Sequence, residues 1–255
     1  MRITVCELPC DPLGMNEAWA TLCRHTRAER SELLLLPEFA FTEPVWLEEV
    51  ARAEAWDRAV ATCEQWMHRL PELGVSHVVG ARPVTRDGQP YNEGFLWSAA
   101  SGPRALRSKY HLPNEPGGWE ATWFRRGNPD FPLFQAGELA FGLSICTEMW
   151  ALENCARYAQ AGAAAILSPR ATAAATTDKW LALGTVLAAR SGAFSLSSNR
   201  VHSTGRCGGV GWIIEPDGRV LARTSPAQPY CTLDLDLTLS PAAASTYPRY
   251  VFCGP

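Results

Sequence analysis

The stretch LAFGLSICTEMWALENCARYAQAGAAAILSP, residues 139–169, contains strand-like and helix-like patterns in succession. Residues 139–145 and 164–167 are short, mostly apolar runs between polar flanks, which is typical of strands that are covered on both faces. Between them, residues 153–161 have the spacing of an amphipathic helix. A strand, a helix and a second strand in this order predict a crossover unit and an α/β fold.

The same patterns continue along the chain and predict one domain over residues 1–255. Apolar side chains at helical spacing follow Thr42-Glu43-Pro44, a good helix start, and predict a helix over 45–70. Turns with Asp-Gly at 86–88 and 216–218 predict hairpins. Further strands are predicted at 30–38, 76–81, 193–196 and 209–214, and a further helix at 178–190. Helices should therefore cover a mixed sheet, or two packed sheets, on both faces.

Composition excludes several classes of function. The net charge is -3, and no basic cluster is longer than Arg125-Arg126, so we expect neither nucleic acid nor an anionic membrane as a partner. No apolar stretch reaches the length of a membrane helix, and we expect a cytoplasmic protein. Nine cysteines without a C-x-x-C pair indicate buried free thiols in a reducing compartment, and the histidines lack metal-ligand spacing. We expect no metal and no cofactor.

Three strand-like runs end on a reactive side chain, namely Glu38, Lys109 and Cys146. Taken singly, each has a plainer explanation: a carboxylate at a helix start, a solvated lysine and a small core residue. Ligand crevices of α/β sheets lie beyond the carboxyl ends of strands, so the three groups can meet despite their separation in sequence. Their shared position predicts one catalytic site.

The three side chains suit attack by a thiol on an amide or a nitrile. A free thiol has a pKa of about 8.5 and is mostly protonated at neutral pH, so it needs a base or a nearby cation. Glu38 would accept the proton. The Lys109 ammonium and the backbone N–H of Thr147 would stabilise the developing negative charge, at about 3 to 4 kcal/mol for each donor.

At these residues the sequence resembles the carbon–nitrogen hydrolase, or nitrilase, superfamily. PEFAF around Glu38, SKYHLPNE around Lys109, the segment from Cys146 to Pro169, and GGVGWIIEPDGRVLA resemble ordered segments of that family over almost the full length. The resemblance implies a single-domain, four-layer α-β-β-α sandwich of two mixed sheets flanked by helices. It also implies a Glu-Lys-Cys triad that acts through a thioester.

A second glutamate near the lysine supports the site in this family, and Glu115 and Glu120 are both candidates. We choose Glu120 as a catalytic residue because Trp123, Phe124 and Gly127 follow it at the family's spacing.

Residues expected to bind the substrate are Phe39, Thr147, Trp150 and Arg170. Arg170 either binds a substrate carboxylate or pairs with Glu148 or Glu153, two alternatives that the sequence leaves open. The chain departs from the family after the cysteine and in its late R-A-x-E-N segment, which puts any inherited specificity in doubt.

The leading function is hydrolysis of a small amide to a carboxylate and ammonia. A nitrilase or an N-carbamoyl amide hydrolase would use the same residues. Two other classes stay open: a thiol hydrolase or transferase with His111 or His202 as base, and an inactive binding protein. Partners are expected to be a small amide, carbamoyl compound or nitrile. The resemblance also implies a homodimer or larger assembly, with the tail at about 240–255 in subunit contacts.

Overall fold

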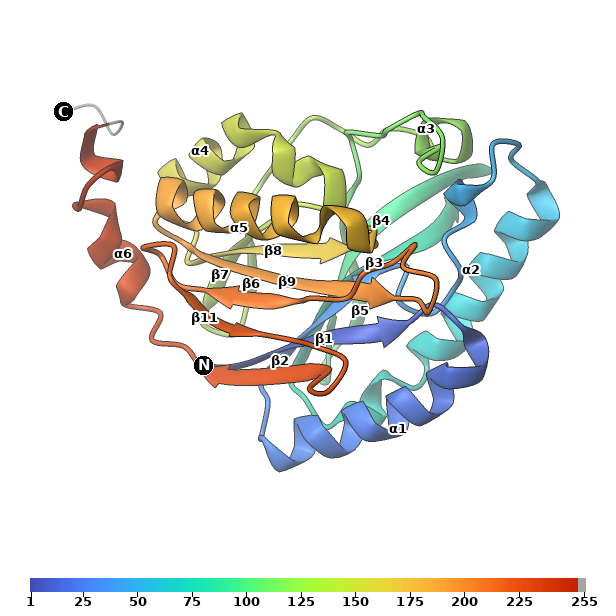
Figure 1. Ribbon diagram of the computed structural model, residues 1–255, viewed down its shortest axis with the longest axis horizontal. Coiled ribbons are helices and arrows are strands. Elements are labelled where there is room, and N and C mark those ends of the chain that lie inside the picture. Colours follow the sequence, from blue (N-terminus) through green and yellow to red (C-terminus); the bar gives the residue numbers. More distant parts are fainter. Residues whose placement is uncertain (252–255) are drawn as a thin grey trace.

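The computed structural model describes residues 1–251 as one twisted α/β sandwich (Figure 1). The strands follow the spatial order β5-β4-β3-β2-β1-β9-β8-β7-β6, with β12 beside β1 and the β10–β11 hairpin beside β9. The strands are β1 (Arg2–Pro9), β2 (Leu33–Glu38), β3 (His77–Arg86), β4 (Gln89–Ser98), β5 (Gly102–Ser108), β6 (Phe134–Ala136), β7 (Leu139–Leu143), β8 (Ala165–Arg170), β9 (Phe194–Val201), β10 (Trp212–Ile214), β11 (Val220–Arg223) and β12 (Tyr230–Asp234).

Helices cover the two outer faces. In Figure 1, α4 and α5 lie on one side of the strands, and α1 lies on the opposite side. The α-helices are α1 (Pro12–Ala28), α2 (Ala53–Met67), α3 (Glu120–Trp123), α4 (Leu152–Gln160), α5 (Thr177–Ser191) and α6 (Leu239–Ala244). The 3-10 turns are η1 (Val45–Leu47), η2 (Leu70–Leu73), η3 (Cys146–Trp150), η4 (Ala174–Thr176) and η5 (Arg249–Val251).

Strand β1 joins the two halves of the sandwich. Its first part pairs with β2 in parallel and with β12 in antiparallel, and its last part, from Glu7 to Pro9, pairs in parallel with β9. The crossover unit predicted from residues 139–169 is confirmed, because β7 and β8 pair in parallel around α4. Both predicted hairpins are also present, as β3–β4 and β10–β11.

The leucines of β2 show why its sequence is apolar throughout. Successive side chains of a strand point to opposite faces. Leu33 and Leu35 belong to the core between the two sheets, whereas Leu34 and Leu36 belong to the core beneath α1 and α2. Neither face of β2 meets water, so both positions of the two-residue period are apolar. The four-layer sandwich of two mixed sheets is thus confirmed.

The helix predicted over residues 45–70 is shorter than expected. Residues 45–47 form the single turn η1, and α2 starts only at Ala53. Trp46 packs against the Phe39 ring, and the indole N–H of Trp123 donates to the Glu48 carbonyl at 2.6 Å. This tertiary bond uses a carbonyl that a continuous helix would need for itself. Helix α1 was not among the predicted helices, although Asp11 caps it and Pro12 opens it.

The eight cysteines within residues 1–251 are all free and buried, as predicted, and Cys253 lies outside the described residues. None of the helices in residues 1–251 has the length and apolar character needed to cross a bilayer. In the tail, Tyr247, Tyr250 and Val251 are exposed, and residues 252–255 are outside the described part of the chain. The subunit contact through this tail stays a prediction.

Candidate active site

The ends of β2 and β5 bring three charged side chains together below the surface. Glu38 is the last residue of β2, Lys109 directly follows β5, and Glu120 is the first residue of α3. The Lys109 ammonium donates to Glu38 Oε1 at 2.9 Å and to Glu120 Oε1 at 2.7 Å. All three side chains are almost completely buried. Of the two glutamates considered beside the lysine, Glu120 makes the contact, and Glu115 lies in an exposed loop.

The charges of this cluster shift its proton affinities. Burial by itself lowers the pKa of Lys109, but the carboxylates of Glu120 and Glu38 outweigh it and hold that pKa above its usual value. Burial raises the pKa of Glu120 to about 8, although the Lys109 ammonium opposes this shift. The lysine therefore stays charged at neutral pH.

Glu38 keeps one carboxylate oxygen available. Its Oε1 accepts from the Lys109 ammonium and from Asn92 Nδ2, the latter at 2.7 Å. Its Oε2 is buried and has no hydrogen-bond partner within residues 1–251. A buried acceptor without a partner is costly, so it marks a place for a water, a proton or a substrate group. Asn92 had no assigned role in the sequence, where nothing distinguishes it from other strand polar residues.

Cys146 lies on a sharp turn between β7 and η3. Its backbone φ is +49°, in the left-handed region that a non-glycine residue adopts only at a cost of about 1 to 3 kcal/mol. Its thiol is close to the charges of Glu38, Lys109 and Glu120. Burial raises the pKa of this thiol to about 12, and the Glu38 carboxylate adds to that shift, while Lys109 opposes it. The resting sulfur is a neutral thiol that needs a base.

Glu148 and Arg107 hold this turn, and neither was assigned a role in the sequence. The buried Glu148 carboxylate accepts from the backbone N–H of Ile145 at 2.9 Å and of Tyr110 at 2.7 Å. Arg107 binds the same carboxylate through both terminal nitrogens, and its Nη2–Oε1 distance is 2.9 Å. The carboxylate thereby ties the residue before Cys146 to the residue after Lys109. In the sequence, the place of Glu148 two residues after Cys146 was the signal that could have pointed to this role.

We expect Glu148→Gln to misplace the nucleophile without touching the substrate. An amide cannot accept from two backbone groups and pair with an arginine as a carboxylate does, so Arg107 would lose its buried counter-ion. Loss of one partner of a buried pair costs about 3 to 5 kcal/mol. Chemical denaturation should show a drop of this order in the free energy of unfolding, and kcat should fall about tenfold or more. Unchanged stability and kcat would contradict this positioning role.

A pocket with a volume of about 400 Å³ opens above Cys146. Thr147 and Trp150 line it, and so does Glu120; contact of Thr147 and Trp150 with a substrate stays a prediction. The remaining lining residues are Trp46, Pro113, Glu115, Pro116, Gly117, Gly118, Ala171, Thr172, Ala173, Thr176 and Trp180. Five separate segments of the chain therefore contribute to this one pocket.

Phe39 and Arg170 are placed elsewhere than predicted. Phe39 packs in an aromatic cluster with Trp46 and Phe124, is only 1% exposed, and does not line the pocket. Arg170 is also 1% exposed, with bonds from its nitrogens to Ser197, Thr172 and the Val210 carbonyl.

The Arg170 guanidinium also stacks over Trp212 at 4.0 Å. A substrate-binding role does not fit this buried position. Neither alternative ion pair is present, because Glu148 binds Arg107, and the three bonds of Arg170 go to residues other than the exposed Glu153.

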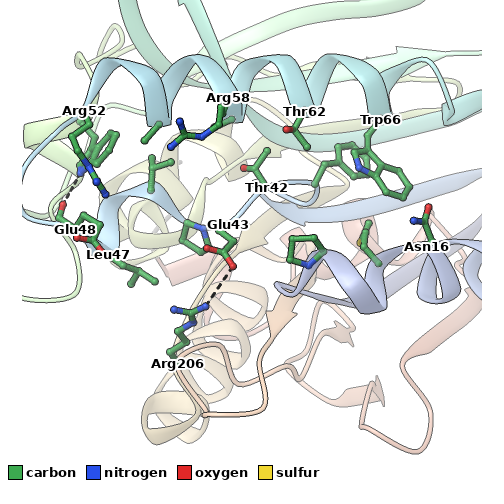
Figure 2. Close-up of a pocket in the computed structure, with 18 residues that line it drawn as sticks. Asn16, Thr42, Glu43, Leu47, Glu48, Arg52, Arg58, Thr62, Trp66 and Arg206 are labelled. Carbon is green, nitrogen blue, oxygen red and sulfur yellow. Dashed lines mark hydrogen bonds and ion pairs between the residues drawn. The ribbon is translucent and has the colours of Figure 1, made fainter.

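A larger hollow of about 570 Å³ lies between α1, α2 and the segment that follows β2 (Figure 2). On its lining, Arg206 and Glu43 form an ion pair at 3.9 Å, Arg58 projects from α2, and Arg52 directly precedes that helix. Its lining includes none of Cys146, Glu38 and Lys109, so its size does not make it the active site.

Neither histidine considered as a base lines the pocket above Cys146. His111 stacks against Phe131 with ring centroids 6.0 Å apart. His202 bonds to Thr204 through Nδ1 and to Arg206 through Nε2.

The fold is an α/β sandwich with a pocket above Cys146, and comparisons with known proteins identify the family of the chain. The chain belongs to the carbon–nitrogen hydrolase family, whose model matches residues 2–244. A relative from Pseudomonas protegens, "Hydrolase in pqqF 5'region", is 32% identical over 174 residues. The match covers 67% of this chain and 59% of the relative, so the chain spans less than two-thirds of that protein.

Two solved structures show the same fold at low identity. A carbon–nitrogen hydrolase from Helicobacter pylori G27 has a TM-score of 0.85 and 18% identity, covering 98% of this chain and 94% of its own. An amidase variant from Nesterenkonia sp. AN1 has a TM-score of 0.76 and 19% identity, covering 100% of this chain and 97% of its own. In that variant, the acetamide moiety of fluoroacetamide is covalently added at the active-site cysteine.

Proposed function

We propose that this protein hydrolyses small amides to a carboxylate and ammonia, with Cys146 as nucleophile and Glu38 as base. The observation that carries this proposal is the unpartnered Glu38 Oε2, buried in a cluster with Lys109 and beside a thiol that needs deprotonation. The Nesterenkonia protein supports this proposal, because it is an amidase of the same fold whose active-site cysteine reacts covalently with fluoroacetamide.

The first half-reaction forms a thioester. Glu38 takes the thiol proton, and the sulfur attacks the amide carbon, so that the carbonyl electron pair moves to oxygen. The Lys109 ammonium and the Thr147 N–H stabilise this oxyanion. Thr147 stands in the first turn of η3, where backbone N–H groups lack acceptors within the helix. The intermediate collapses, the carbon–nitrogen bond breaks, and Glu38 returns its proton to the departing ammonia.

The second half-reaction releases the acid. A water takes the place of ammonia, Glu38 removes one of its protons, and the oxygen attacks the thioester carbon. The carbon–sulfur bond then breaks, and the proton on Glu38 returns to the sulfur. Glu120 keeps Lys109 in place through both steps by its 2.7 Å contact.

The test is a panel of small amides, nitriles and carbamoyl compounds, assayed for ammonia release and for a covalent adduct by mass spectrometry of acid-quenched protein. Amides should give ammonia together with an acyl adduct that maps to Cys146. Glu38→Gln should slow ammonia release at least about a thousandfold, because general base catalysis and proton return both fail. If Glu38→Gln kept the wild-type rate, Glu38 would not be the base. If the adduct mapped to another cysteine, Cys146 would not be the nucleophile.

A further inference from the structure

The pocket above Cys146 has an unbalanced set of charges. Within residues 1–251, the ionisable side chains on its lining are Glu115, Glu120 and the Cys146 thiol, and no lysine, arginine or histidine is among them. Glu120 is already bound to Lys109. The free charge at the pocket is therefore that of Glu115.

Glu115 is held in place and has no counter-ion. The chain turns tightly here, since the Gly118 N–H donates to the Glu115 carbonyl at 2.8 Å and the Glu115 N–H donates to the Gly118 carbonyl at 3.3 Å. The Glu115 carboxylate forms no hydrogen bond or ion pair with another described residue. A fixed backbone with an unpaired carboxylate gives the pocket a negative wall.

Indole rings form another part of the lining. Trp46, Trp150 and Trp180 all border the pocket, and Trp150 and Trp180 meet edge to face with ring centroids 5.5 Å apart. Trp150 is 51% exposed, which is unusual for so large an apolar side chain. The faces of such rings attract organic cations, and the exposed Trp150 ring together with an acidic group is the chemistry of ammonium recognition.

Neither nearby cation is available to a substrate carboxylate. Lys109 donates to two carboxylates, and its remaining N–H is assigned to the scissile carbonyl oxygen in the proposed mechanism. Arg170 is buried with its nitrogens bonded and its guanidinium 5.8 Å from the Trp180 ring. An anionic substrate would meet Glu115 and find no partner of opposite charge.

From this lining we infer that the pocket selects amides that carry a positive charge, such as an ammonium group, at the end remote from the scissile carbonyl. The inference rests on the proposed amide hydrolysis and specifies its substrate class. Glu115 is the residue that determines charge specificity, and Trp150 and Trp180 provide the cation-attracting surface.

Three amides of equal length test this inference: 5-aminopentanamide, hexanamide and 5-carboxypentanamide, which end in an ammonium, a methyl group and a carboxylate. We expect kcat/KM for ammonia release to be about tenfold higher for the cationic amide than for hexanamide, and lower still for the anionic one. The difference should reside mainly in KM, because the remote charge is bound equally in the ground and transition states. High salt should reduce this difference in KM, because it screens the charge of Glu115.

Two variants distinguish an effect of Glu115 on substrate preference from an effect of the net charge of the protein. Glu115→Gln should reduce the preference for 5-aminopentanamide over hexanamide to about twofold. Glu138→Gln removes the same charge from the exposed turn between β6 and β7, outside the pocket, and should leave the preference intact. A preference that survives Glu115→Gln would overturn the role of this residue.

Binding to the inactive Cys146→Ala protein, measured by calorimetry, separates the two proposals. Hydrolysis of hexanamide at the same efficiency as the cationic amide would overturn the inference and leave amide hydrolysis standing. If no amide is hydrolysed but Cys146→Ala binds the cationic amide most tightly, the inference holds and the proposed function fails. Equal binding of all three amides would also reject the inference.

Discussion

Cys146→Ala should abolish ammonia release from every amide while leaving a folded protein. The proposed mechanism has no path that bypasses the sulfur, because the thioester is an obligatory intermediate. Alanine has the same Cβ as cysteine, so the left-handed backbone at φ +49° is no more strained than before. The stability should change by only about 1 kcal/mol, since the thiol is small and makes no hydrogen bond to another side chain.

Three measurements check this expectation together. Ammonia release should fall to the background of buffer alone, the circular dichroism spectrum should be unchanged, and no acyl adduct should form. Cys155→Ala is the matched control, because that thiol is also buried but lies on α4, where its sulfur contacts the Leu187 carbonyl. Residual turnover above about 1% in the Cys146 variant, or its loss in the Cys155 variant, would contradict the assignment.

Lys109→Met should remove both activity and a large part of the stability. The ammonium is the only described cation in hydrogen-bond contact with Glu38 and with Glu120, and all three side chains are buried. Loss of one member of a buried ion pair typically costs about 3 to 5 kcal/mol. Loss of one oxyanion donor slows catalysis by about a hundredfold to a thousandfold. Methionine keeps the length and the apolar stem of lysine, so packing should change little.

The stability of Lys109→Met should depend on pH in a definite direction. Without the ammonium, nothing opposes the burial that raises the pKa of Glu120, so this pKa should lie further above the unfolded value of about 4.3. A raised folded pKa contributes stability below the unfolded pKa, and that contribution is lost as the pH rises. The free energy of unfolding of the variant should therefore be closest to that of the wild type near pH 5. The difference between the two should grow as the pH rises to 8. Urea denaturation across this range measures the difference.

A double variant distinguishes electrostatics from packing. Lys109→Met with Glu120→Gln removes one of the two carboxylates left without a cation. It should recover part of the lost stability but none of the activity, because the oxyanion donor is still absent. A double variant no more stable than Lys109→Met alone would show that the cost comes from packing rather than from buried charge.

The fold was predictable because its signals are local. The apolar runs of β2, β7 and β8, the helical spacing of α4 and α5 and the two Asp-Gly turns each reflect a short-range rule. The helix over 45–70 was wrong in its first part because distant residues decided it: the Trp123 indole takes the Glu48 carbonyl. The cap of α1 was readable from Asp11 and Pro12 and was overlooked.

The residues of the candidate site were likewise predictable only where their signals are local. Glu38, Lys109 and Glu120 stand at strand ends or in family-like segments, and the structure brings them into contact, although their catalytic roles stay proposals. Glu148 had a sequence signal in its place two residues after Cys146, but its bonds to Tyr110 and Ile145 and the pairing with Arg107 join two loops that no local pattern connects. Arg170 was misplaced because sequence shows that it ends a strand, but not that the protein itself occupies its nitrogens.

The sequence by itself determined the order of strands and helices and the chemical groups at the strand ends, because hydrophobic periodicity and turn residues act over a few neighbouring positions. Only the tertiary structure decided which side chains reach the pocket and with what charge. Burial and contacts between segments dozens of residues apart fix those properties: they leave Glu115 unpaired at the pocket, enclose Arg170, and bury the Cys146 thiol near the charges of Glu38 and Lys109.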